Sequence, residues 1–353
     1  MKSRESWVDY AKAIGIILVV YGHVARGLYN GGIDISVTSF ELIDSVVYSF
    51  HMPLFFFLSG LFFYKSFSKN GGAKLIFSKV DTVFYPYVIW SLLQGSVQVL
   101  LSNYTNGNVT LVKVFSVLWS PGAQFWFLYA LFAIFILSSV VYSLFSKRFT
   151  LLIFICSVAL YLYPILLPQG FIFRFISSNF VFFVLGIIFT MYLKTAYFAS
   201  WLACFSLALS FMFGQWLFHG YLSYGYMDKG VESLLLACIS IAFVVSISLL
   251  LSRSNFKYLA YIGSSSMGIY LMHIFAASGS RVILSKALKV DSVVIHLVIG
   301  CLMGVVAPLI ALFLIDKVKL KYVLSAPVSS LVIKSYNKLS KGDGKINSSS
   351  KKK

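Results

Sequence analysis

Long apolar stretches, separated by short polar segments, repeat along almost the whole chain. A stretch of about 20 apolar residues is long enough to cross the hydrocarbon core of a bilayer as an α-helix. A transmembrane β-barrel would instead show short segments of alternating polarity, which this sequence lacks. The pattern therefore predicts about ten membrane-spanning helices, at residues 11–29, 46–64, 82–101, 124–145, 150–167, 173–193, 197–218, 232–251, 262–283 and 293–315.

The distribution of cations along these segments predicts the orientation of the chain. Cytoplasmic segments of membrane proteins carry an excess of Lys and Arg. With the N-terminus in the cytoplasm, most of the 29 Lys and Arg residues fall on the inner side. Those that fall on the outer side are Arg26, Lys113, Arg174, Lys229, Arg281, Lys286 and Lys289. An even number of spans then returns the C-terminus to the cytoplasm.

Composition supports the same class of protein. The sequence is 59% hydrophobic and 11% charged, whereas a soluble domain is roughly a quarter charged. We expect an all-α polytopic integral membrane protein with a cytoplasmic N-terminus at 1–10, one transmembrane domain at 11–316 and a Lys-rich cytoplasmic tail at 317–353. The tail is polar and poor in aromatic residues, so we expect it to be disordered.

The net charge of +18 fits this interpretation. Cations on membrane proteins set orientation and contact anionic lipid headgroups, so anionic lipids are the expected partner of the basic tail and nucleic acid is not. The four cysteines fall inside predicted spans without metal-ligand spacing. The sequence has no glycine-rich phosphate loop and no HExxH zinc motif, so we expect neither a metal nor a permanently bound cofactor.

A few polar residues lie at membrane depth, where they are costly and are candidates for function. In the segment "KAIGIILVVYGH", His23 follows Lys12 by eleven residues, which is roughly three helical turns and about 16 Å along one face. His51 and His273 lie in two other predicted spans. The alternative is that each histidine only bonds a neighbouring helix, and that Lys12 only pairs with Asp9, one turn away.

Five segments, in this order and spacing, resemble the type-3 membrane acyltransferases, and more narrowly their fucose 4-O-acetylase-like branch. They are "WVDYAKAIGIILVVYGH", "HMPLFFFLSGLFF", "PYVIWSLL", "FWFLYAL" and "IGSSSMGIYLMH", and the resemblance covers residues 5 to 316. It implies a multi-pass enzyme of the bacterial inner membrane. Such an enzyme moves an acyl group, usually acetyl, from cytoplasmic acyl-CoA to a sugar hydroxyl of a surface polysaccharide or lipid-linked glycan.

The family carries an arginine followed eleven residues later by a histidine in its first helix. His23 matches the histidine, and Lys12 stands where the arginine usually is. Lysine keeps the charge but lacks the planar two-pronged fork of arginine. Acyl transfer to an alcohol needs a base, donors for the oxyanion and a pocket that excludes water. We predict that His23 is the general base, with an acyl-histidine intermediate as the competing role, and that Lys12 holds a CoA phosphate or an internal carboxylate.

Other polar and aromatic residues are weaker candidates. Ser264, Ser265 and Ser266 begin the ninth predicted span, where a helix N-terminus could bind CoA phosphates or the serines could simply cap the helix. The residues predicted to contact substrate are His51, Tyr270, His273, Trp126 and Ser59. Helix packing is the alternative for the segment that contains Ser59, and an interfacial aromatic belt is the alternative for Trp126. The acidic segment "GGIDISVTSFELID" is predicted to be an outer loop.

A membrane transporter or flippase for a glycolipid or small polar solute is the alternative function. Intramembrane His and Lys would then form a gating or proton-relay path. Transporters often contain inverted repeats with helices broken at Gly or Pro in both halves. The prolines Pro53, Pro86 and Pro308 form no such pairing, which favours the enzyme.

Overall fold

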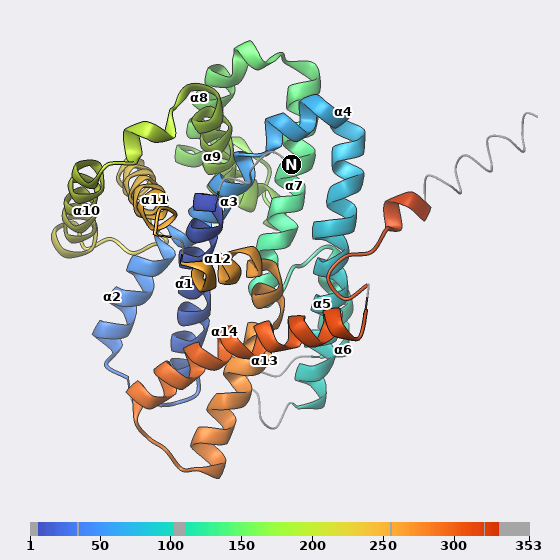
Figure 1. Ribbon diagram of the computed structural model, residues 1–353, viewed down its shortest axis with the longest axis vertical. Helices are drawn as coiled ribbons and strands as arrows, with labels where there is room; N and C mark the ends of the chain where they lie inside the picture. The colour runs from blue at the N-terminus through green and yellow to red at the C-terminus, as the bar shows by residue number, and fades with distance from the viewer. Residues whose placement is uncertain (1–5, 34, 102–109, 255, 321, 332–353) are drawn as a thin grey trace, which may run out of the picture.

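The computed structural model describes residues 6–33, 35–101, 110–254, 256–320 and 322–331, and these ranges contain helices but no strand (Figure 1). Short 3-10 and π-helical turns extend or connect several of the helices. The α-helices are α1 Ser6–Asn30, α2 Val37–Tyr48, α3 His51–Gly60, α4 Phe63–Lys79, α5 Tyr85–Leu100, α6 Leu111–Phe115, α7 Trp126–Leu144, α8 Thr150–Leu162, α9 Phe171–Tyr192, α10 Trp201–Gln215, α11 Val231–Leu251, α12 Lys257–Ser264, α13 Ser266–Val282 and α14 Val293–Lys317.

Eight helical segments of the described chain are long and apolar enough to cross a membrane. They are Ser6–Asn30, Val37–Leu61, Leu111–Leu144, Phe171–Tyr192, Trp201–Tyr221, Val231–Leu251, Ser266–Ala287 and Val293–Lys317. The remaining two predicted spans, 82–101 and 150–167, coincide with the shorter helices α5 and α8. The prediction of an all-α polytopic membrane protein is therefore confirmed, while the number of spans stays a prediction.

The ends of the helices are arranged as the predicted topology requires. In Figure 1 the connection between α7 and α8 lies at one end of the molecule, and the connections between α1 and α2 and between α13 and α14 lie at the other. The cation distribution assigns these connections to opposite sides of the membrane. Which end faces the cytoplasm stays a prediction.

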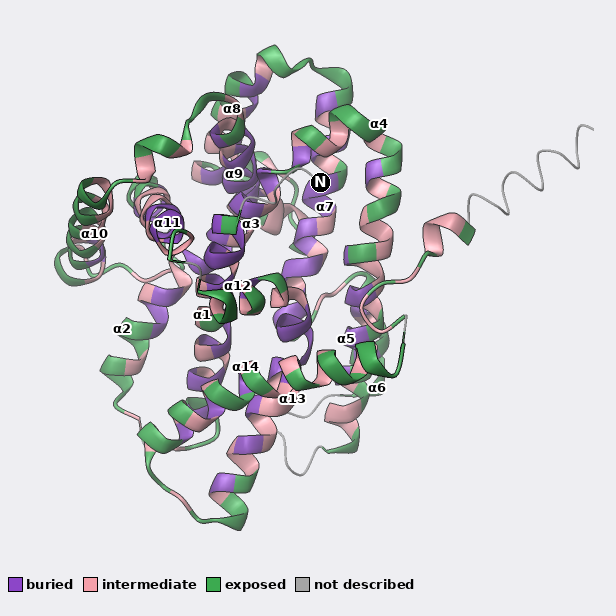
Figure 2. Ribbon diagram, in the orientation of Figure 1, coloured by how far each residue is buried: buried purple, intermediate pink, exposed green. Residues whose placement is uncertain are grey.

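Helix α1 occupies the interior of the helical assembly. It packs against α2, α3, α11, α12, α13 and α14, and Ala11, Ile16 and Val20 have no exposed surface. Figure 2 shows the buried residues concentrated in α1, α3, α7 and α9, whereas α10 is largely exposed. Because neighbouring helices surround α1, the face from Lys12 to His23 points into protein rather than towards lipid.

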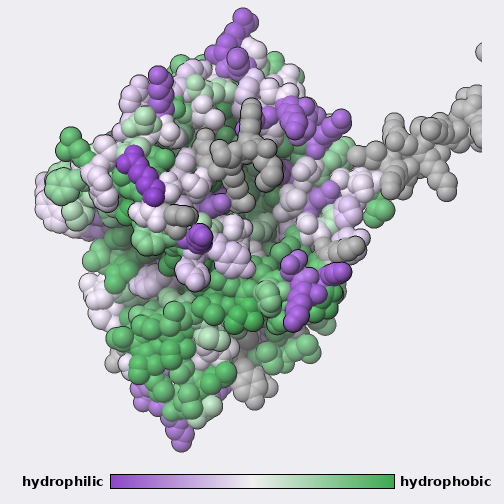
Figure 3. Space-filling view, viewed as in Figure 1, coloured by the Kyte–Doolittle hydropathy of each residue, from purple (hydrophilic) through white to green (hydrophobic). Residues whose placement is uncertain are grey.

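The outer surface is apolar over the helices that have few neighbours. Hydrophobic residues cover much of the lower part of the face shown in Figure 3, where α14 crosses the molecule. The exposed side chains of α14 include Val294, Val298, Leu302, Val306 and Phe313. An apolar surface of this extent is expected where a helix contacts lipid.

Two regions differ from the predicted loops and tail. Helix α2 begins at Val37, so most of the predicted acidic outer loop is helical; Asp34 lies outside the described residues. Residues 322–331 pack against the α4–α5 region: Trp90 donates to the carbonyl of Val323, and Ser329 donates to the Asp81 carboxylate. These bonds attach the first part of the predicted tail to the helices. The Lys-rich segment 332–353 lies outside the described residues.

The backbones of helices α3 and α9 approach each other so closely at Gly60 and Gly186 that no side chain would fit at either position. A methyl group at Gly60 would lie 2.0 Å from the carbonyl oxygen of Phe183, and one at Gly186 would lie 2.1 Å from that of Phe57. The interpretation of "LSG" as a helix-packing site is thus confirmed, since small residues let backbones meet in membrane helices.

We predict that Gly60→Ala destabilises the protein, because its methyl group cannot fit without separating α3 from α9. Overpacking of this kind costs about 1–3 kcal/mol, which should lower the apparent melting temperature measured by tryptophan fluorescence in detergent. Gly279→Ala is the matched control, since it adds a methyl to helix α13 where nothing lies within 4 Å. Equal melting temperatures for the two variants would contradict the packing described here.

Candidate functional site

A cavity of about 410 Å³ lies beside the outer half of α1. Its lining includes His23 of α1, His51 of α3, Trp126 of α7 and Tyr270 of α13. These four residues are far apart in the sequence, and each was a candidate from its place within an apolar segment. The structure brings them to one cavity.

His273 lies directly behind His23, with 5.1 Å between the centres of the two rings. Its Nδ1 atom lies 2.8 Å from the carbonyl oxygen of Tyr270, so Nδ1 carries the proton and Nε2 is left as an acceptor. That Nε2 atom is buried and has no hydrogen-bond partner among the described residues. An unpaired buried acceptor beside a second imidazole is a costly arrangement that calls for a functional explanation.

His51 has the same tautomer for the same reason. Its Nδ1 donates to the carbonyl of Val47 at 2.7 Å, which leaves Nε2 as the acceptor. Its ring meets the edge of the Tyr48 ring at 4.5 Å between centres. In the part of the chain that the structure describes, no group of three His, Cys, Asp or Glu side chains is placed to hold a metal ion.

Arg26 fixes the outer wall of the cavity. Its guanidinium makes two parallel hydrogen bonds of 2.8 Å to the Asp44 carboxylate, lies 3.4 Å above the centre of the Tyr48 ring and donates to the Tyr226 hydroxyl at 3.1 Å. Sequence reasoning treated Arg26 only as a topology cation and Asp44 as part of an acidic loop. The signal that could have found Arg26 is its position three residues after His23, on the same helical face.

An amide pair forms the wall opposite Arg26. Gln94 and Gln124 exchange hydrogen bonds of 2.6 and 3.1 Å while buried, and the Tyr270 hydroxyl donates to the backbone carbonyl of Gln124. Both glutamines line the cavity. They were not among the predicted residues, although a glutamine inside the predicted span 82–101 was a usable signal.

Lys12 lies at the other end of α1, away from this cavity. Its Nζ is 4.0 Å from the Asp9 carboxylate, the predicted local pairing. The pKa of Lys79 is lowered mainly by burial and also by the positive charge of Lys12, which lies nearby. The end of α1 with Lys12 therefore carries two neighbouring lysines.

The predicted serine cluster lies at the same end as Lys12. Gly263 of α12 packs directly on the backbone of Asp9, and Ser264, Ser265 and Ser266 follow at the junction of α12 and α13. Ser264 donates to the carbonyl of Tyr261. Ser59 is placed differently: its hydroxyl donates to the Phe55 carbonyl of its own helix, and it does not line the histidine cavity.

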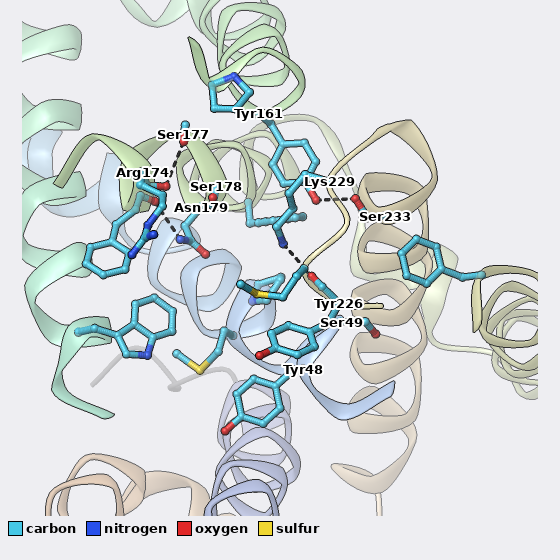
Figure 4. Close-up of a pocket in the computed structure, with 18 residues that line it drawn as sticks. Tyr48, Ser49, Tyr161, Arg174, Ser177, Ser178, Asn179, Tyr226, Lys229 and Ser233 are labelled. Atoms are coloured by element: carbon cyan, nitrogen blue, oxygen red, sulfur yellow. Dashed lines mark hydrogen bonds between the residues drawn. The ribbon is translucent and has the colours of Figure 1, made fainter. Parts of the chain in front are cut away.

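A second cavity, of about 420 Å³, adjoins the first (Figure 4). Tyr48, Met52 and Trp126 line both cavities. The second cavity extends towards the N-terminal end of α9 and the segment that precedes α11. The second cavity therefore lies next to the one that contains His23.

Comparison with known proteins identifies the class. A family model described as "Acyltransferase domain" matches residues 5–313. Nodulation protein NolL from Mesorhizobium japonicum is 28% identical over 194 residues, a region that covers 53% of this chain and 48% of that protein. The match thus spans about half the length of this curated relative. No solved structure matches the chain significantly.

We predict that Asp44→Asn lowers the stability of the outer wall, because it leaves the Arg26 charge without its two-pronged partner. Both side chains retain some solvent contact, so the loss should be about 1–3 kcal/mol rather than the value for a fully buried pair. Glu41→Gln, on the exposed side of the same helix, is the control and should be neutral. The measurement is thermal unfolding in detergent, and equal stability of the two variants would contradict the structural role of the Arg26–Asp44 pair.

Proposed function

The chain belongs to this acyltransferase family, and from that membership and the histidine-lined cavity we propose that it transfers an acetyl group from cytoplasmic acyl-CoA to a sugar hydroxyl. The acceptor is a surface polysaccharide or lipid-linked glycan, and the site of action is the bacterial inner membrane. The observation that carries the proposal is that His23 and His51 line one cavity and that His273 lies against the ring of His23. Family membership weighs against the transporter alternative.

His23 is the proposed general base. In the described part of the chain it makes no hydrogen bond, and it lines the cavity, so a ring nitrogen is available to an acceptor hydroxyl. The hydroxyl oxygen attacks the thioester carbonyl carbon as His23 takes its proton. The carbon–sulfur bond then breaks, and His23 returns the proton to the departing CoA thiolate. Such proton transfer typically accelerates a reaction by about 10²–10⁴-fold.

His273 and the amide pair have supporting roles in this mechanism. In this proposal the Nε2 of His273 accepts the N–H of His23 and so holds His23 in the tautomer that presents a lone pair to the hydroxyl; the two ring centres are 5.1 Å apart. Hydrogen bonds of this kind often tighten only when substrate binds. Gln94 and Gln124 use part of their donor capacity on each other, and their remaining N–H groups are candidates to stabilise the oxyanion.

The donor is proposed to bind at the other end of α1. Lys12, Lys79 and the serines Ser264–Ser266 gather there, about 16 Å from His23 along the helix, a separation that an extended CoA arm can bridge. Lysine contacts a phosphate as a point charge, so the replacement of the family's arginine keeps this interaction possible. Acyl-CoA is a substrate in this scheme, and no resident cofactor is needed.

The acceptor is proposed to approach from the opposite end. The first cavity, which contains His23, is also lined by His51, Trp126 and Tyr270. These three side chains would contact the sugar as its hydroxyl reaches His23. Ser59 bonds within its own helix and has no contact with this route. Anionic lipids are proposed as partners of the Lys-rich tail, where they would hold the cytoplasmic end at the membrane surface.

We predict that His23→Gln reduces acetyl transfer by at least about a hundredfold, since it removes the proposed general base. Membranes that contain the protein would be incubated with radiolabelled acetyl-CoA, and label in the glycan fraction would be measured at matched expression. His296→Gln is the control, because His296 lies in α14 and bonds to the carbonyl of Val290 away from the cavity. Full transfer by His23→Gln would refute the catalytic role.

We predict that Lys12→Met raises KM for acetyl-CoA about tenfold with little change in kcat. In the wild type the Lys12 charge would bind the donor equally in the ground state and in the transition state, so its removal weakens binding without slowing the chemical step. Lys12→Arg should stay within about threefold of wild type, as it restores the charge. Lys74→Met removes an exposed lysine of α4 and serves as the control. An unchanged KM in Lys12→Met would exclude Lys12 from the donor site.

A further inference from the structure

The second cavity has charged residues of one sign only. Arg174, on α9, and Lys229, in the segment before α11, extend into it from different elements (Figure 4). Both residues line the cavity and retain exposed surface. Among the described residues no carboxylate lies within 4.0 Å of either cation. The described residues of the lining thus present two positive charges, and no negative one, to whatever occupies it.

Nearby acidic groups are engaged elsewhere. The carboxylate of Asp228 accepts the backbone N–H of Gly225 at 2.8 Å. Asp228 and Glu232 line a smaller adjoining cavity, which Lys229 also lines, and neither acidic residue lines this one. Lys229 contacts two neutral groups: its Nζ lies 3.3 Å from the carbonyl oxygen of Tyr226 and 5.8 Å from the centre of the Tyr161 ring. An anion could therefore reach this ammonium without displacing an ion pair.

Arg174 is held by aromatic rings. Its guanidinium carbon lies 5.3 Å from the centre of the Phe171 ring and 5.9 Å from that of Phe175. Phe175 in turn stacks on Trp126, with 5.2 Å between ring centres. Arginine stacked in this way keeps its donor edge free for a carboxylate or phosphate, which it binds with two parallel hydrogen bonds.

The remaining lining fits a sugar ring. Trp126, Tyr161 and Phe175 supply flat aromatic surfaces. Ser177 and Asn179 each donate one hydrogen bond to a carbonyl of their own helix, so their oxygen atoms, together with the hydroxyl of Ser178, are the polar groups left for a ligand. The volume is that of an ordinary small-molecule site. Because Trp126 and Tyr48 also line the His23 cavity, a sugar here would lie next to the reaction centre.

We propose that the second cavity binds a sugar unit of the acceptor that carries an anionic group, a phosphate or a carboxylate, and that Arg174 and Lys229 select it by ion pairing. This assignment rests on the proposed function, because the occupant is the glycan that receives the acyl group. Tyr226 couples the two cavities, since its hydroxyl accepts from Arg26 and its carbonyl from Lys229. Neutral sugars would leave the two cations unpaired and should bind less tightly.

The direct test compares three soluble probes on the full-length wild-type protein in phosphatidylcholine nanodiscs. Glucose 1-phosphate, glucuronate and glucose would be titrated by saturation-transfer NMR. At least one of the two anions should bind about tenfold more tightly than glucose and should weaken as salt is raised. The tighter of the two anions identifies the group as phosphate or carboxylate. Equal affinity for all three sugars would overturn the proposal without use of any variant.

Variants then locate the site. Lys229→Gln and Arg174→Gln should each reduce affinity for the favoured anion about tenfold and leave glucose unchanged, whereas Lys229→Arg and Arg174→Lys should retain most of it. Lys113→Gln removes another predicted outer cation, on α6, and is the matched control. Anion binding that is unaffected by both glutamine variants would contradict the assignment.

Two further experiments distinguish failure of the anionic subsite from failure of the proposed function. If phosphatidylglycerol in the nanodisc abolishes binding of the sugar anion, a lipid headgroup fills the cavity and the acceptor assignment is wrong. Transfer of acetyl from acetyl-CoA to membrane glycans would be measured with the same variants. No transfer by wild type refutes the proposed function, whereas normal transfer by both glutamine variants refutes only the anionic subsite.

Discussion

A polar side chain at membrane depth has no water to bond, so it must find its partner inside the protein or remain unsatisfied at high cost. The arrangement around α1 follows from this constraint. Arg26 bonds to Asp44 and Tyr226, and Lys12 lies near Asp9. Polar side chains on α1 therefore require it to be surrounded by other helices. The apolar faces of α10 and α14 have no such requirement and can contact lipid. Among the described residues, the buried Nε2 of His273 is one of several side-chain atoms without a hydrogen-bond partner, and it lies beside the ring of His23, which lines the cavity.

The interior position of α1 also orders the proposed reaction in space. Lys12 and the serines at the α12–α13 junction lie at one end of the helix, and His23 lies about three turns away. The cavity with Arg174 and Lys229 continues from His23 towards the opposite end. A donor and an acceptor that enter from opposite sides would thus meet at one histidine, with Trp126 and Tyr48 at the boundary between the two cavities. Aromatic residues line both cavities, and in the proposed reaction they would limit the access of water, which competes with the sugar hydroxyl.

Much of this could be predicted from the sequence, because hydropathy and helical spacing are local properties. Apolar stretches identified the all-α membrane class, and the spacing of Lys12 and His23 placed them on one face. The helical character of 37–44 was missed because Glu41 and Asp44 made the segment look like a loop; Asp44 is tolerated there because Arg26, 18 residues earlier, neutralises it. Gln94 pairs with Gln124 across 30 residues, and no local pattern reveals such a partner. Ser59 was predicted to contact substrate, but its direction depends on which face of α3 packs against α9. Hydropathy does not determine this rotation.

The most direct test of a reaction centred on His23 is to map where the acyl group lies when the donor is bound. An acyl-CoA analogue with a photoreactive group in its acyl chain would be crosslinked to the wild-type protein in nanodiscs, and the labelled residues identified by mass spectrometry. We predict that label falls on the lining of the first cavity, on residues such as Gln124, Trp126 and Tyr270, and that excess acetyl-CoA prevents it. Label confined to lipid-facing helices such as α10, or to the end of α1 beside Lys12, would contradict a transfer site at His23.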